Sequence, residues 1–324
     1  MNLTFSKKDD FKKILTKSKP GLIRLAKELY IEDISDDFFL EIVIPLSFYL
    51  NSFNKKNTPY LIGLTGGQGS GKTTLSLFIQ QVLQDIFKRK AVGFSIDDIY
   101  KTKSERNKIA KKIHPLCSVR GVPGTHDVNL GIRTINNLLK AKPSTITYIP
   151  SFSKIQDKHF PKKDWQKYKG RPDFIFFDAW CGGAKPIPKN KWRPPLNKLE
   201  KEKDPEQIWA KWSNNELAGE YQSLFNRFDK LIFIQVEKME SVYENRWLQE
   251  KTMSKGIKDK RLLKNIMTKD QIKNFVMHYE RLTRHILDEM PDQADIVIYR
   301  AVSYTHLRAH ETREDLVWRL VRVK

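Results

Sequence analysis

Short apolar runs separated by longer polar or amphipathic segments recur through most of the chain. The runs that fit buried strands are 60–64, 91–96, 146–149, 173–177, 230–236 and 295–299. After the first of them, Leu75, Phe78, Ile79 and Val82 recur at helical spacing. This alternation is typical of an α/β fold, in which helices cover both faces of a mainly parallel sheet. Ligands of such sheets bind at the carboxyl ends of the strands.

The first 58 residues follow a different pattern. Apolar residues recur at helical spacing between Phe11 and Leu29, and a second apolar run extends from 38 to 53. A polar break over 51–59 then precedes the first strand, and the segment contains no chemical motif. We therefore expect an N-terminal helical extension over 1–58 and a single α/β domain over 59–300.

The last residues read as a foreign sequence. The stretch VSYTHLRAHET at 302–312 matches the translation of a transposase-type sequencing adapter letter for letter. The alternative is a natural amphipathic helix, which the spacing of Leu316, Val317 and Leu320 permits. We expect 301–324 to be a non-native, adapter-derived tail without a functional role.

One glycine-rich segment carries the most specific chemical signal. It fits G-x-x-x-x-G-K-[ST] and lies between the first strand and a helix, as a phosphate-binding P-loop requires. The backbone N–H groups of such a loop cradle phosphates, its lysine reaches the β- and γ-phosphates, and its hydroxyl ligates Mg²⁺. The expected nucleotide-binding residues are Gly66, Gly67, Gln68, Gly69, Ser70, Gly71, Lys72, Thr73 and Thr74.

Composition narrows the class of protein and its partners. A hydrophobic share of 40% in 324 residues suits a globular protein, and no apolar run is long enough to span a bilayer. The two cysteines have no metal-type spacing, so we expect reduced thiols and a cytoplasmic location. The formal net charge of +21 would suit a polyanion. However, the lysines are spread as doublets without interleaved aromatics, which favours solvated lysine faces. An acidic, phosphorylated substrate would also suit a basic cleft.

Two of the expected strands end in carboxylates. Asp97 and Asp98 follow the strand at 91–96, and either could take a proton from a substrate hydroxyl. The alternative is an Asp-Asp turn or helix cap. Asp178 follows the run at 173–177, where a strand of this kind delivers a carboxylate to Mg²⁺ directly or through water.

Two further segments carry polar groups suited to substrate and phosphate. Arg120 opens a Gly/Pro turn and can bind a carboxylate in a bidentate fork, with Thr125 and His126 as further contacts. The alternative for Thr125 and Asp127 is capping of the helix that follows, which is compatible with substrate contact. Arg246 begins a basic stretch that could supply a lid cation to the transferring phosphoryl group, or it could lie on a solvated helix face.

Taken together, these segments resemble the P-loop small-molecule kinases related to phosphoribulokinase, uridine kinase and pantothenate kinase. Within that group they are most similar to the plant and bacterial D-glycerate 3-kinases. The resemblance covers about 20–300. The shared segments are 66–74, 95–100, 120–131, 148–154, 177–184, 217–229, 245–253 and 267–279.

The resemblance implies an ATP- and Mg²⁺-dependent transfer of phosphoryl to the 3-hydroxyl of D-glycerate. Asp97 aligns with the catalytic base, and Lys72 and Arg246 would stabilise the moving charge. Metal binding is assigned to Thr73 with Asp97 or Asp178. The substrate-binding residues implied are Asp98, Tyr100, Arg120, Thr125, His126, Asp127 and Lys154.

The chain departs from this family at two positions, and two other functions remain open. Asp178 stands where the family has a glutamate in an E-G-W motif, and Ser153 stands where an aspartate commonly precedes the lysine. Another small-molecule kinase, acting on a nucleoside or a pantothenate-like substrate, would share most of these motifs. A nucleic-acid-associated P-loop ATPase would use the net positive charge. Oligomeric state has no signal in the sequence.

Overall fold

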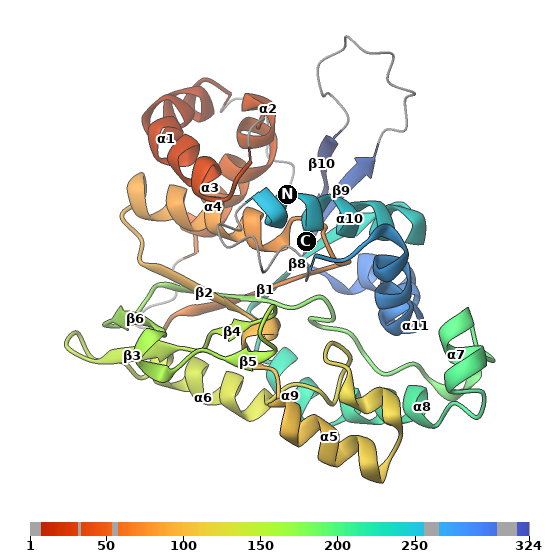
Figure 1. The fold of residues 1–324 in the computed structure, drawn as a ribbon. Coiled ribbons are helices and arrows are strands. Elements are labelled where there is room, and N and C mark those ends of the chain that lie inside the picture. Colours follow the sequence, from red (N-terminus) through yellow and green to blue (C-terminus); the bar gives the residue numbers. More distant parts are fainter. Residues whose placement is uncertain (1–7, 32–33, 54–57, 256–265, 303–315, 324) are drawn as a thin grey trace.

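A six-stranded sheet forms the centre of the molecule (Figure 1). The computed structural model describes residues 8–31, 34–53, 58–255, 266–302 and 316–323. The strand order is β10-β9-β8-β1-β7-β2, and only β10 runs antiparallel to its neighbour. The strands are β1 (Tyr60–Gly66), β2 (Ala91–Ser95), β7 (Phe174–Asp178), β8 (Lys230–Val236), β9 (Ile296–Val302) and β10 (Leu316–Val323). The expected mainly parallel α/β fold is confirmed.

One of the expected strands lies outside this sheet. β3 (Ile146–Ile149) pairs antiparallel with β6 (Gln166–Lys169), and β4 (Phe152–Ser153) pairs with β5 (Lys158–His159) in a small hairpin. Burial alternates along β3, whereas every residue of the central strand β7 is buried. An alternating pattern is typical of an antiparallel strand with one solvated face, which distinguishes β3 from the strands of the parallel sheet.

The N-terminal helices cover one face of the sheet together with the helix after the P-loop (Figure 1). These elements are α1 (Lys8–Glu28), α2 (Asp36–Phe38), the π-helical turn η2 (Phe39–Val43), α3 (Ile44–Asn51) and α4 (Lys72–Asp85). The ring centroids of Phe39 and Phe78 lie 5.3 Å apart at 80°. The helices of the expected extension therefore share one hydrophobic core with the P-loop helix. The division of the chain into an extension over 1–58 and a domain over 59–300 stays a prediction.

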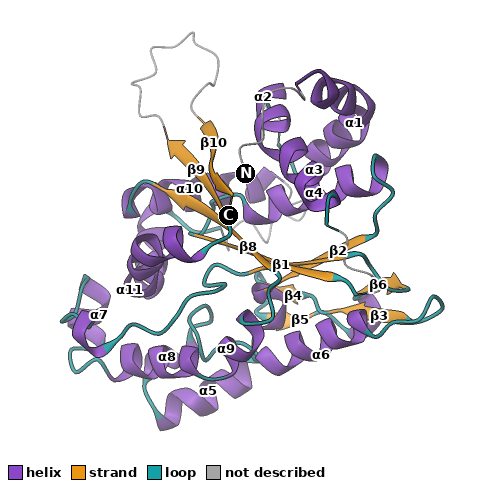
Figure 2. Ribbon diagram, turned by 180° about the vertical axis from the view of Figure 1, so that it is seen from behind, coloured by secondary structure: helices purple, strands orange, loops and turns teal. Residues whose placement is uncertain are grey.

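The second face is covered by helices from the later part of the chain, as the view from behind shows (Figure 2). Residues of α6, α8, α9 and α11 pack there against β1, β2 and β7. Helices α5, η4, α10 and α11 contribute residues to the site described below. The bounds of the helices in this part of the chain are α5 (Lys103–Lys112), η4 (Pro115–Ser118), α6 (Val128–Leu139), α7 (Lys198–Lys203), α8 (Ile208–Ala218), α9 (Glu220–Phe225), α10 (Met239–Lys255) and α11 (Lys269–Gln293).

The predicted foreign tail includes part of the sheet. β10 pairs with β9 from Leu316↔Val302 to Val323↔Ile296, so it forms the outermost strand, and residues 303–315 lie outside the described residues. The adapter origin of 301–324 stays a prediction. None of the helices in the described part of the chain has both the length and the apolar character that a bilayer crossing needs.

The shared core leads to a test of the N-terminal helices. Replacing Phe39, which is fully buried, with alanine should lower the free energy of unfolding by about 3–5 kcal/mol, because it opens a cavity against Phe78. Phe160→Ala is the control, because that side chain is 41% exposed. Urea unfolding of both variants measures the difference. Equal, small losses would show that the N-terminal helices do not stabilise the sheet.

Candidate active site

The P-loop joins β1 to α4 and has the backbone that the motif requires. Gly66, Gly69 and Gly71 have φ angles of 148°, 74° and 91°, which favour glycine. A Cβ on Gly69 would lie 2.4 Å from the backbone carbon and oxygen of Asn245 in α10. Arg300 of β9 donates to the Gly69 carbonyl at 2.7 Å. The loop is therefore held from both sides by elements distant in sequence.

Lys72 is folded against its own loop. Its Nζ donates to the carbonyl oxygens of Gly66 and Gly67, both at 2.9 Å. Burial lowers the pKa of Lys72, and the negative charges of Asp178 and Asp97 oppose that effect. The ammonium group is consequently close to both carboxylates that the sequence assigned to the site.

The register of the parallel strands brings the carboxylates together. Asp178 is paired with Leu64 of β1 on one side and with Ser95 of β2 on the other. Thr73, in the first turn of α4, donates a hydrogen bond from Oγ1 to Asp178 Oδ2. Burial raises the pKa of Asp178, while Lys72 and the Thr73 hydrogen bond act in the opposite direction.

Asp97 has two strong partners. Tyr100 donates to Oδ1 and Lys154 donates to Oδ2, each at 2.5 Å. Burial alone would raise the pKa of Asp97, but the charge of Lys154 and both hydrogen bonds outweigh it and hold the pKa well below its usual range. In this arrangement the carboxylate is ionised and its proton affinity is low.

The side chain of Asp98, unlike that of Asp97, caps the backbone of the turn that contains it. Its Oδ2 accepts a hydrogen bond from the Ser95 N–H at 2.9 Å and completes a capping box around the short helical turn at 96–99. Burial raises the pKa of Asp98 to about 6, against the effect of that hydrogen bond. The capping alternative left open by the sequence therefore applies to Asp98, although its side chain also lines the cavity.

A cavity of about 570 Å³ contains most of the residues assigned to the site. It lies at the carboxyl ends of the central strands, where α/β proteins bind ligands. The residues expected from the sequence that line it are Gln68, Gly69, Lys72, Thr73, Asp97, Asp98, Tyr100, Arg120, Lys154, Asp178 and Arg246.

Three expected substrate contacts support the loop instead of lining the cavity. Thr125 accepts from the Gly121 N–H and donates to the Val122 carbonyl, and Asp127 caps α6 through the Leu130 N–H. His126 stacks on Tyr100 with ring centroids 4.6 Å apart. Burial lowers the pKa of His126 to about 3, so the ring is neutral at pH 7. Contact of these residues with a substrate stays a prediction.

Arg246 reaches the cavity from α10. Its guanidinium forms a 2.5 Å ion pair with Glu250 one helical turn later and lies 5.5 Å from the centroid of the Phe275 ring. Only 9% of the residue is exposed, so it does not lie on a solvated helix face. Its position beside the P-loop suits a cation that stabilises a transferring phosphoryl group.

The sequence pattern does not single out several of the residues that line this cavity. They are Arg106, Asp157, Glu250 and Trp180, and also Tyr279, which lies at the end of a segment shared with the kinase family. Arg106 lies in a lysine-rich helix whose pattern resembles a solvated face. Asp157 lies in the turn of the β4–β5 hairpin, which the hydrophobic pattern did not indicate.

The oxygen atoms at the P-loop fit a magnesium ion. The Thr73 hydroxyl and the carboxylates of Asp97 and Asp178 line one cavity, and Mg²⁺ prefers oxygen ligands. Among the described residues, no group of three or more His, Cys, Asp or Glu could enclose a metal alone. This is compatible with Mg²⁺, which usually binds through one or two carboxylates together with substrate phosphates and water.

Kinases are among the curated proteins that are similar in sequence to this chain. The chain is 26% identical over 258 residues to the uncharacterized kinase mug58 of Schizosaccharomyces pombe, covering 74% of this chain and 86% of that protein. It is 28% identical over 196 residues to the chloroplastic D-glycerate 3-kinase of Arabidopsis thaliana, covering 58% of this chain and 40% of that enzyme. The chain is therefore similar in sequence to a D-glycerate 3-kinase. The resemblance expected from the sequence is confirmed, and the relatives support a kinase. No family model matches the chain.

Solved structures share the fold. The YGR205w protein superposes with a TM-score of 0.61 at 20% identity, covering 87% of this chain and 99% of that one. The D-glycerate 3-kinase of Cryptococcus neoformans has a TM-score of 0.58 at 20% identity, covering 80% of this chain and 93% of that one. The shared fold therefore extends over most of the chain.

The contacts of Lys72 predict the effect of its removal. Lys72→Met should reduce phosphoryl transfer by roughly 10²-fold or more, because a preorganised charge at the phosphates is lost. The fold should persist, because the substitution removes a buried charge and keeps the apolar stem. Steady-state kinetics and thermal melting measure the two effects. Turnover equal to that of the wild type would contradict a P-loop kinase.

Proposed function

We propose that this protein is an ATP-dependent kinase that phosphorylates the 3-hydroxyl of D-glycerate, giving 3-phospho-D-glycerate and ADP. One observation carries the proposal: a single cavity is lined by the P-loop Lys72, the carboxylate Asp97 and the guanidinium of Arg120. These groups suit a phosphate, a hydroxyl proton and a carboxylate, respectively. The similarity to D-glycerate 3-kinases supports the choice of substrate.

Transfer depends mainly on positioning and on neutralising charge. The substrate hydroxyl oxygen forms a bond to the γ-phosphorus, its proton passes to Asp97, and the bond from that phosphorus to the ADP oxygen breaks. Lys154 must leave Asp97 Oδ2 for the carboxylate to accept the proton, because the ion pair lowers the proton affinity of Asp97. Lys72 and Arg246 stabilise the negative charge on the moving phosphoryl group.

Thr73, together with Asp178 or, through water, Asp97, would hold Mg²⁺ at the phosphates. When bound, the ion neutralises charge on the β- and γ-phosphates. The short side chain of Asp178 still reaches Thr73, as their hydrogen bond shows, so a glutamate is not needed to join the strand β7 to the P-loop.

The cavity favours a small acid over a nucleoside. D-glycerate has one carboxylate, which suits the Arg120 guanidinium, and two hydroxyls, one of which suits Asp97. A nucleoside would need an open aromatic face for its base. Trp180 and Tyr279 line the cavity, but they are 5% and 3% exposed and pack edge-to-face against each other at 5.0 Å.

The two adjacent aspartates provide a test of the base. Asp97→Asn should lower kcat by roughly 10²–10⁴-fold, the usual contribution of a positioned base. The KM for ATP should change little. Asp98→Asn is the matched control, because its amide oxygen can still accept from the Ser95 N–H. If Asp98→Asn is the inactive variant and Asp97→Asn turns over normally, the base has been assigned to the wrong carboxylate.

A substrate panel tests the proposed function directly. D-glycerate should drive ADP release well above uridine, pantothenate or ribulose 5-phosphate. Arg120→Ala should raise the KM for D-glycerate by the equivalent of about 1.5–3 kcal/mol and leave the KM for ATP nearly unchanged. A coupled ADP assay with mixed substrates measures both. If uridine or pantothenate is preferred, the protein is a P-loop kinase of a different small molecule, and stimulation by polynucleotide would favour an ATPase.

A further inference from the structure

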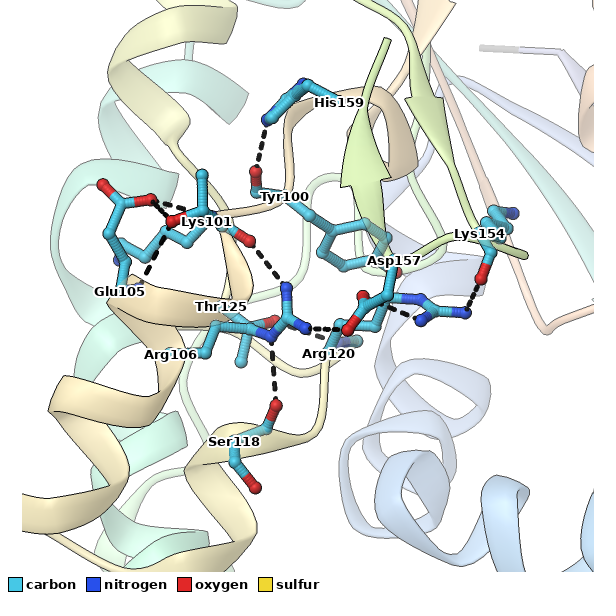
Figure 3. Close-up of polar contacts among 12 residues, drawn as sticks. Tyr100, Lys101, Glu105, Arg106, Ser118, Arg120, Thr125, Lys154, Asp157 and His159 are labelled. Atoms are coloured by element: carbon cyan, nitrogen blue, oxygen red, sulfur yellow. Dashed lines mark hydrogen bonds and ion pairs between the residues drawn. The ribbon is translucent and has the colours of Figure 1, made fainter.

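Two arginines share one carboxylate at the edge of the cavity (Figure 3). Arg106 comes from α5, Arg120 follows η4, and Asp157 lies in the turn between β4 and β5. Asp157 Oδ2 accepts from Arg106 Nη2 at 2.6 Å, and Asp157 Oδ1 accepts from Arg120 Nη1 at 2.9 Å. The carboxylate therefore uses both oxygens, one for each guanidinium.

The two arginines differ in how easily they could release Asp157. Arg106 is 1% exposed, and its other N–H groups donate to the carbonyls of Ser118 at 3.0 Å and Lys101 at 2.6 Å. Removing its only carboxylate partner in the described structure would leave a buried charge uncompensated, which is strongly unfavourable. Asp157 is therefore firmly bound to Arg106.

Arg120 is held less tightly. Its side chain is 26% exposed, and its second hydrogen bond goes to a neutral acceptor, the Lys154 carbonyl, at 2.9 Å. The Arg120 guanidinium thus presents two N–H groups toward the hairpin turn, in the fork geometry that a free carboxylate binds best. A carboxylate ligand could take both N–H groups without disturbing the ion pair between Arg106 and Asp157.

The charges of this cluster leave room for one more anion. Arg106, Arg120 and Asp157 together carry one excess positive charge, and the nearby Lys154 is already paired with Asp97. A monocarboxylate would balance the cluster, whereas a neutral polyol would not. Asp157 itself has a φ angle of 50°, so the turn holds its carboxylate in place with a left-handed backbone that aspartate tolerates better than most residues.

We propose that Asp157 competes with the substrate for Arg120: it occupies the Arg120 guanidinium in the absence of substrate and yields it to the substrate carboxylate. Asp157 remains on Arg106 when the acid binds. A ligand with its own carboxylate replaces the contact that Arg120 loses, whereas a neutral hydroxy compound leaves the pair of Arg120 and Asp157 in place. The inference rests on the proposed function in that the substrate is a hydroxy acid, but it does not depend on that acid being D-glycerate.

Two substitutions of Asp157, to asparagine and to glycine, remove the competing charge. Both also leave the buried Arg106 guanidinium without its carboxylate partner, so the melting temperature of each variant is measured together with ligand binding. Asp157→Asn keeps the shape of the side chain, and Asp157→Gly removes the side chain. Both asparagine and glycine tolerate the left-handed backbone at this position. Asp164→Asn is the matched control, because it removes one exposed negative charge from the segment just after the same hairpin. Isothermal calorimetry of each protein with D-glycerate, L-lactate, D-lactate and glycerol gives the dissociation constants.

The Asn and Gly variants should bind D-glycerate or the lactates roughly three- to tenfold more tightly than the wild type, because a competing charge-assisted hydrogen bond is gone. Glycerol binding and the Asp164→Asn control should not change. If a lactate follows this pattern and D-glycerate does not bind, the inference stands and the proposed substrate fails.

Other outcomes would overturn the inference. Unchanged or weaker binding of the acids in both variants would show that Asp157 supports Arg120 and does not compete for it. An equal gain for glycerol would indicate a general opening of the cavity. Failure of both variants to fold, or the absence of carboxylate binding by the wild type and the variants alike, would leave Asp157 with a structural role alone.

Discussion

Pairing of buried charge is the constraint on which this site depends. Removing an ion from water costs several kcal/mol unless a partner compensates it. The buried Arg106 is therefore matched with Asp157 and the buried Arg246 with Glu250, while Lys72 donates to loop carbonyls. The more exposed Lys154 and Arg120 are paired with Asp97 and Asp157. The charged side chains of this cavity therefore already have partners before a ligand binds. A ligand exchanges partners with groups that are already satisfied, so its affinity depends on how well it reproduces the contacts that it displaces.

The parallel sheet explains why these groups can meet at all. β1 lies between β7 and β8, and β2 lies beyond β7, so the carboxyl ends of three strands place the P-loop, Asp178 and the turn with Asp97 side by side. Hydrophobic contacts on both faces of the sheet fix this register. The catalytic geometry is in this sense a consequence of core packing, and the small hairpin of β4 and β5 adds Lys154 and Asp157 from outside the sheet.

Features that depend on local pattern could be predicted from the sequence. The P-loop, the central strands and the carboxylates after β2 and β7 are of this kind, because glycine spacing, apolar runs and strand ends are all visible along the chain. The arrangement of Arg106 around Asp157 joins residues 51 positions apart and has no local signature. The position of His126 likewise depends on tertiary packing against Tyr221 and Tyr100, which no spacing in the loop reveals. The sequence predicts β3 as a strand, but a run of four residues does not specify which strand it pairs with.

The contacts that Asn245 and Arg300 make at Gly69 affect the thermodynamics of nucleotide binding. The backbone of α10 closes against this glycine and Arg300 holds its carbonyl, so the loop is immobilised as the chain folds. The conformational entropy of the phosphate cradle is then lost during folding and not upon ligand capture. Arg246 directly follows the residue that approaches Gly69, so its guanidinium already lies beside the P-loop in the folded chain. Ligand selection at this end of the cavity consequently depends on a cradle whose shape is set before a ligand binds.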